Sequence, residues 1–103
     1  MTDAGRCGLS EALLADLRET FARFPEVQEV WLYGSRARGD FGPGSDIDLA
    51  IVAPGMSRER FAALYGALLD LPCAFPMDIL RWEELEDADL RARILAQRRR
   101  LYP

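Results

Sequence analysis

The residues best suited to chemistry in this sequence are aspartates, and two of them are separated by a single residue. Asp46 and Asp48 lie in a β-forming run, where alternate side chains point to the same face of a strand. Two carboxylates about 7 Å apart repel each other, whereas a divalent cation is held by their oxygens. An isolated pair of this kind is more often a solvated strand end, so it indicates a metal site only together with other signals.

A third aspartate, Asp78, interrupts the otherwise apolar run 76–80. A carboxylate buried in such a strand costs free energy unless another group pairs with it. If this strand lies beside the strand of Asp46 and Asp48, the three carboxylates make a two-metal site. The alternative is an exposed aspartate on an edge strand, which Pro76 also favours because proline cannot donate to a strand ladder.

Glycine and arginine are concentrated in the segment that precedes this pair. Gly34 and Ser35 follow a predicted strand, and Arg36 and Arg38 come directly afterwards. Glycine allows the backbone to approach a ligand closely, and the serine hydroxyl with the following amides can hold phosphate oxygens. Arginine binds phosphate through its planar fork of donors. An ordinary turn with two solvated arginines is the alternative, but beside carboxylates the segment is typical of a Mg²⁺-dependent nucleoside triphosphate site.

The basic residues exclude several other mechanisms. All 13 are arginines, so the chain has no lysine, and it has no histidine either. These absences exclude a P-loop, a Schiff-base lysine, a Ser-His-Asp triad, a Cys-His dyad and a mixed Cys/His zinc site. With 17 acidic residues the net charge is −4, which argues against direct nucleic-acid binding.

Apolar spacing and capping residues predict three helices and three strands. Ser10 and Ser57 are suited to helix N-caps, and Pro25 is suited to ending the first helix. The predicted helices span 10–24, 57–70 and 87–99, and the predicted strands span 27–33, 46–52 and 75–80. The link 34–45, with at most one helical turn, favours an antiparallel pair over a crossover connection.

This order of elements predicts a mixed α+β fold, with a small mixed sheet of about three strands and helices packed mainly on one face. We expect residues 1–8 to form a flexible tail and residues 9–103 to form a single domain. No apolar run reaches membrane length and no apolar signal segment opens the chain, so we expect no membrane contact and no secretion. The two cysteines, Cys7 and Cys73, form no CxxC motif, which is typical of a reduced cytoplasmic protein.

The motif residues together resemble the signature of the DNA-polymerase-β-like nucleotidyltransferase superfamily. That signature is a hydrophobic residue, Gly and Ser, then about ten residues, then Asp-hydrophobic-Asp-hydrophobic. Here Tyr33 precedes Gly34 and Ser35, ten residues separate Ser35 from Asp46, and Asp78 corresponds to a third carboxylate. The GSRARG motif at residues 34–39 and the short chain look most like the minimal nucleotidyltransferase subfamily. Its members are often paired with a HEPN-domain protein as a toxin–antitoxin module.

The resemblance implies a nucleotidyltransferase fold and a Mg²⁺-dependent reaction with ATP. Asp46, Asp48 and Asp78 would be the catalytic residues and would hold two Mg²⁺ ions. Asp78 would also help to activate the attacking hydroxyl. Gly34 and Ser35 would bind the β- and γ-phosphates.

The same resemblance implies in-line attack of a hydroxyl on the α-phosphate, with release of pyrophosphate. Either Arg36 or Arg38 would stabilise charge on the pyrophosphate. The leading hypothesis is an antitoxin that transfers AMP to a hydroxyl, expected to belong to a tyrosine, of a partner HEPN toxin. The alternatives are a small-molecule nucleotidyltransferase of the aminoglycoside type and a non-catalytic antitoxin that acts by contact alone. The nucleotide base and the choice between a homo- and a hetero-oligomer are left open.

Overall fold

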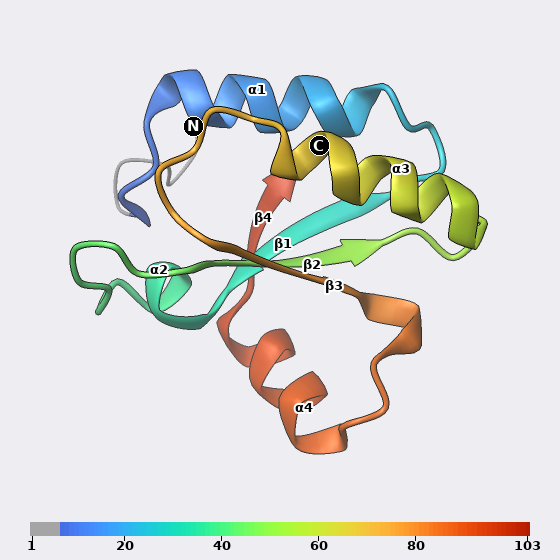
Figure 1. Ribbon diagram of the computed structural model, residues 1–103. Helices are drawn as coiled ribbons and strands as arrows, with labels where there is room; N and C mark the ends of the chain where they lie inside the picture. The colour runs from blue at the N-terminus through green and yellow to red at the C-terminus, as the bar shows by residue number, and fades with distance from the viewer. Residues whose placement is uncertain (1–6) are drawn as a thin grey trace.

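The sheet has four strands, and the computed structural model describes residues 7–103 of the chain (Figure 1). The strands are β1 (Glu29–Tyr33), β2 (Ile47–Val52), β3 (Met77–Arg81) and β4 (Arg99–Tyr102). Their order in the sheet is β3-β2-β1-β4. Strand β1 is antiparallel to β2 and β4, whereas β2 and β3 are parallel. The mixed sheet and the antiparallel pairing of the first two strands are therefore confirmed, and β3 lies at an edge.

The helices begin at the capping residues that the sequence indicates. They are α1 (Glu11–Ala22), α2 (Gly34–Arg38), α3 (Arg58–Leu69) and α4 (Ala88–Gln97), with a 3₁₀ turn η2 (Trp82–Glu84). The Ser10 hydroxyl accepts a hydrogen bond from the Leu13 amide, and the Ser57 hydroxyl accepts one from the Arg60 amide, both at 3.1 Å. Each bond satisfies an amide that has no partner within its helix.

Helices α1 and α3 lie over one face of the sheet and close the main core (Figure 1). Their apolar stripes meet side chains that alternate along the strands, because successive strand residues point to opposite faces. Phe21 of α1 and Leu64 of α3 are fully buried against Leu32, Leu49 and Ile51 of the sheet. This face buries most of the apolar surface that drives folding.

Helix α4 lies over the opposite face, as Figure 1 shows below the sheet. Ile94 of α4 packs there with Trp31, Tyr33 and Ala50, and the Trp31 ring meets Trp82 edge-on at 4.9 Å between centroids. Two of the three long helices therefore cover one face, as the expectation of helices mainly on one face requires, and α4 covers part of the other. The alternation of Trp31 and Tyr33 with leucine and valine gives β1 two apolar faces, which requires cover on both sides.

The C-terminal segment corrects the expected number of strands, which is four where about three were predicted. The last helix ends at Gln97, two residues before its predicted end at 99, and residues 99–102 form β4, which is not among the predicted strands. Arg99 and Arg100 pair with β1, and Leu101 turns inward and is buried. The alternation of exposed and buried residues stabilises a fourth strand against β1.

The N-terminal segment enters the core before α1 begins. Of the tail expected over 1–8, residues 1–6 lie outside the described residues, while Cys7 is buried, as is Leu9. Across residues 7–103, no helix has both the length and the apolar character required to cross a bilayer.

Candidate active site

Strand pairing brings two of the predicted carboxylates to the same level of the sheet. Asp48 of β2 is the register partner of Asp78 of β3, and on its other side it pairs with Tyr33 of β1. Asp46 lies one residue before β2. Because side chains at the same level of neighbouring strands share a face, Asp48 and Asp78 lie on the face that α4 covers in part.

Asp48 carries the electrostatic effect of the two neighbouring carboxylates. Burial, followed by the negative charges of Asp78 and Asp46, raises the pKa of Asp48 to about 6. Burial, followed by the negative charges of Asp78 and Asp48, also raises the pKa of the Tyr33 hydroxyl above its usual range. Such concentrated negative charge is unfavourable for the folded chain by itself, and it is the arrangement that a divalent cation stabilises.

Gly34 connects this carboxylate cluster to the turn that follows β1. Its φ of +75° lies in the left-handed region, which favours glycine. A Cβ atom at this position would collide with the Asp48 carboxylate, so the backbone of the turn approaches that carboxylate more closely than any other residue type would allow. The turn continues as α2, whose second residue is the half-buried Ser35.

Arg38 is the arginine of α2 that remains exposed on the side of the carboxylates. Its Nε donates to the Asp40 carboxylate at 3.3 Å, and its Nη1 donates to the Gln97 side chain at 3.4 Å. Its positive charge acts to lower the pKa of Asp48, which places it within electrostatic reach of the cluster. An exposed guanidinium in this position is available to an anionic ligand.

Arg36 lies in the interior, with 2% of its surface exposed. Its Nε and Nη2 donate to the Ser45 carbonyl at 3.1 and 2.9 Å, and its Nη1 donates to the Cys7 carbonyl at 2.9 Å. This placement differs from the solvent-facing position expected of a phosphate ligand. The structure therefore separates the two arginines that the sequence pattern treats alike.

Two residues near the C-terminus support the turn and were not anticipated from the sequence. Arg99 donates from Nε to the Ala37 carbonyl at 2.6 Å, and Gln97 accepts from Arg38. Both contacts span about sixty positions in the chain, so no local pattern could have indicated them. The arginine run at 98–100 is the nearest signal in the sequence.

The donor set suits a hard divalent cation, because it consists of carboxylates that repel one another. Within residues 7–103, however, no group of three or more acidic or cysteine side chains is already arranged to hold a metal ion. The carboxylates therefore fit a divalent cation in their donor type, their strand register and their charge. The carboxylates would have to turn toward a bound ion.

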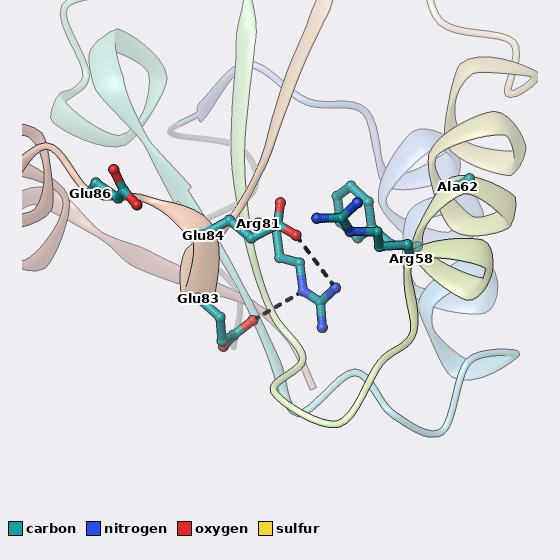
Figure 2. Close-up of a pocket in the computed structure, with 7 residues that line it drawn as sticks. Arg58, Ala62, Arg81, Glu83, Glu84 and Glu86 are labelled. Atoms are coloured by element: carbon teal, nitrogen blue, oxygen red, sulfur yellow. Dashed lines mark ion pairs between the residues drawn. The ribbon is translucent and has the colours of Figure 1, made fainter.

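A hollow of about 460 Å³, separate from the aspartate carboxylates, lies between α3 and η2 (Figure 2). Arg81 spans it, with ion pairs of 3.6 Å to Glu83 and 3.8 Å to Glu84 that Figure 2 marks. The Arg81 Nη2 also donates to the carbonyls of Ala53 and Met56. These contacts tie the turn after β2 to η2, so this arginine has a structural role at the opposite end of β3 from Asp78.

Comparison of the sequence with models of protein families identifies the family to which the chain is similar. The model of the polymerase β nucleotidyltransferase family matches residues 15–103, which include every residue of the site described above. No curated protein sequence matches the chain significantly.

Solved structures share the fold at low sequence identity. A toxin–antitoxin complex crystallised with AMP-PNP is 23% identical with a TM-score of 0.63, covering 90% of this chain and 73% of that one. A doubly substituted MntA–HpeT toxin–antitoxin mutant is 20% identical with a TM-score of 0.60, covering 90% and 72%. A candidate nucleotidyltransferase from Sulfolobus solfataricus is 22% identical with a TM-score of 0.50, covering 87% and 82%.

Proposed function

Because the chain belongs to the polymerase β nucleotidyltransferase family, it is a nucleotidyltransferase, and we propose that it transfers AMP from ATP to a tyrosine hydroxyl of a partner HEPN toxin. The observation that carries this proposal is the pairing of Asp48 with Asp78 at one level of the sheet, directly beside the Gly34 turn. Carboxylates and a phosphate-binding turn are the two components that nucleotidyl transfer requires.

In this reaction the hydroxyl oxygen of the acceptor attacks the α-phosphorus of ATP, and the bond from that phosphorus to the oxygen bridging the β-phosphate breaks. Asp46, Asp48 and Asp78 would hold two Mg²⁺ ions, which when bound supply positive charge against the phosphates and acidify the attacking hydroxyl. Asp78 is exposed at the edge of the sheet, where it is accessible to an acceptor and can receive the proton of its hydroxyl.

The phosphates are bound by the turn that follows β1. The Ser35 hydroxyl and the amides of α2 donate to the β- and γ-phosphate oxygens. Of the two arginines, Arg38 is assigned to the departing pyrophosphate, because its guanidinium is exposed whereas that of Arg36 is occupied by backbone carbonyls. Positive charge at this position is most useful as the pyrophosphate leaves.

Two observations support an antitoxin role with a protein acceptor. The first is the likeness of the fold to two toxin–antitoxin structures, one of which was crystallised with AMP-PNP, an analogue of ATP. The second is the net charge of −4, which disfavours a nucleic acid as the acceptor.

The proposal is tested by transfer of label from α-³²P-ATP, with Mg²⁺, onto the proteins of the native host lysate. Wild type is compared with Asp46→Asn/Asp48→Asn and with Asp70→Asn, which removes an exposed carboxylate at the end of α3. We expect one labelled protein band with the wild type and with Asp70→Asn, and none with the double variant. Equal labelling by a folded double variant would contradict the proposal.

A further inference from the structure

The buried guanidinium of Arg36 occupies a position between the two halves of the proposed site. Arg36 follows Ser35 in α2, whereas the carbonyl that receives two of its hydrogen bonds belongs to Ser45, the residue directly before Asp46. A third hydrogen bond reaches the Cys7 carbonyl ahead of α1. The side chain therefore links the phosphate-binding turn to the first carboxylate of the cluster.

Two aromatic rings hold the guanidinium in place. Its central carbon lies 5.1 Å from the centroid of the Phe41 ring and 4.4 Å from that of Phe75. Both distances are within the range of a cation–π contact, which gains strength where water is excluded. Phe75 lies three residues before Asp78, so the same side chain also contacts the segment that leads into β3.

The loop between α2 and β2 needs such a restraint. Residues 39–45 contain Gly39, Gly42 and Gly44, and glycine gives a chain more conformational freedom than any other residue. Within the loop, the Ser45 hydroxyl accepts a hydrogen bond from the Gly42 amide at 2.9 Å, while the Ser45 carbonyl is fixed by Arg36. The end of the loop next to Asp46 is thus the part that is fixed.

We infer that Arg36 is a positioning residue that fixes Asp46 relative to the phosphate-binding turn and to Asp78, and that it does not contact the nucleotide. This inference rests on the proposed function, because it assigns Asp46 to the metal site. Arginine is required because two of its donors converge on one carbonyl while a third points to another. Lysine has a single nitrogen and no planar face for the two rings, so it cannot reproduce this set of contacts.

The test measures metal and nucleotide affinity separately, without an acceptor. Mn²⁺ binding is followed by electron paramagnetic resonance, and binding of a fluorescent ATP analogue is followed in the presence of a chelator. We expect Arg36→Lys to weaken Mn²⁺ binding about 10-fold or more, in the range typical for residues that orient metal ligands, and to leave nucleotide affinity within about twofold. Arg38→Lys should show the reverse pattern.

Amide hydrogen exchange in β1 and β2 checks that Arg36→Lys is folded. A second variant provides an independent control. Phe75→Leu keeps an apolar side chain but removes one of the two rings, and it should weaken Mn²⁺ binding in the same direction by a smaller factor. Wild-type affinity for Mn²⁺ in folded Arg36→Lys, or a selective loss of nucleotide affinity, would overturn the inference. If the wild type itself bound no Mn²⁺, the proposed function would fall and the inference with it.

Discussion

The two faces of the sheet differ in what they hold. The face under α1 and α3 is a continuous apolar core in which side chains such as Phe21 and Leu49 are fully buried. The face under α4 has a small apolar cluster around Ile94 at one end and the carboxylates of Asp48 and Asp78 at the other. The apolar core and the proposed chemistry are therefore separated across one layer of backbone, and the strands hold the two at a fixed distance.

This difference explains how a small domain tolerates mutually repelling charges. The carboxylates raise the free energy of the folded chain, because burial and repulsion shift the pKa of Asp48 upward. The opposite face offsets that cost by burying apolar surface. Residues on the two faces should accordingly respond to substitution in opposite ways.

The largest expected effect is on the carboxylate face. Asp48→Asn should reduce nucleotidyl transfer by about 10³-fold or more, equivalent to about 4 kcal/mol of transition-state stabilisation, because the amide neither holds a cation nor carries charge. The measurement is the initial rate of label transfer from α-³²P-ATP. The native fold should survive, as judged by circular dichroism, and a variant that keeps more than a tenth of the wild-type rate would remove Asp48 from the site.

On the core face, Phe21→Ala should lower the free energy of unfolding by about 3–5 kcal/mol, because it leaves a cavity under α1. The exposed control on α4 is Leu95→Ala, whose side chain is 47% exposed, and it should change stability by about 0.5 kcal/mol or less. Chemical denaturation of both variants gives the comparison. Similar losses of unfolding free energy in the two variants would contradict the expectation that the core under α1 supplies most of the stability.

Substitutions at two glycines in the left-handed region distinguish the effect of backbone strain on stability from the effect on the transfer rate. Gly34→Ala and Gly39→Ala should each cost about 1–2 kcal/mol, since φ is +75° and +91° at these positions. Only at Gly34 does the added Cβ meet the Asp48 carboxylate, whereas no atom lies within 4 Å of a Cβ at Gly39. Transfer should therefore fall more than about tenfold in Gly34→Ala and little in Gly39→Ala. Thermal melting and rate assays on the same samples measure both effects, and equal rate losses would argue against a close approach at Gly34.

The smallest expected effect is on the pH dependence of stability. The pKa of Asp48 is about 6 in the folded chain and about 3.8 when unperturbed, so the folded state binds the proton more tightly. Stability from this group is present at low pH and is lost as pH rises from about 4 to about 6. Asp48→Asn should raise the Tm by at most about a few degrees above pH 6, because solvent screens the partly exposed group. Below pH 4 the two proteins should melt alike, and a Tm gain that is independent of pH would contradict this assignment.

Local signals in the sequence were sufficient for much of the fold. The caps Ser10 and Ser57, the antiparallel pair across 34–45 and the edge position of β3 all follow from residues that act on their immediate neighbours. Strand β4 could not be anticipated in this way. Its four residues gain their structure from pairing with β1, about seventy positions earlier in the chain.

The candidate site shows the same limit. Spacing was enough to nominate Asp46, Asp48 and Asp78, since a period of two and a neighbouring strand suffice to put carboxylates on one face. Arg36 and Arg38 have the same chemistry and nearly the same position in the sequence. The carbonyls of Cys7 and Ser45 hold Arg36 in the interior, whereas Arg38 remains exposed.

The most direct test of the account asks which phosphorus of ATP is transferred by the carboxylate face. Parallel reactions with α-³²P-ATP and γ-³²P-ATP, each with Mg²⁺ and host lysate, are compared between wild type and Asp48→Asn. The account predicts a labelled protein from the α-labelled nucleotide only, and only with the wild type. A protein labelled from the γ-position in an Asp48-dependent manner would show phosphoryl transfer and would contradict nucleotidyl transfer at this site.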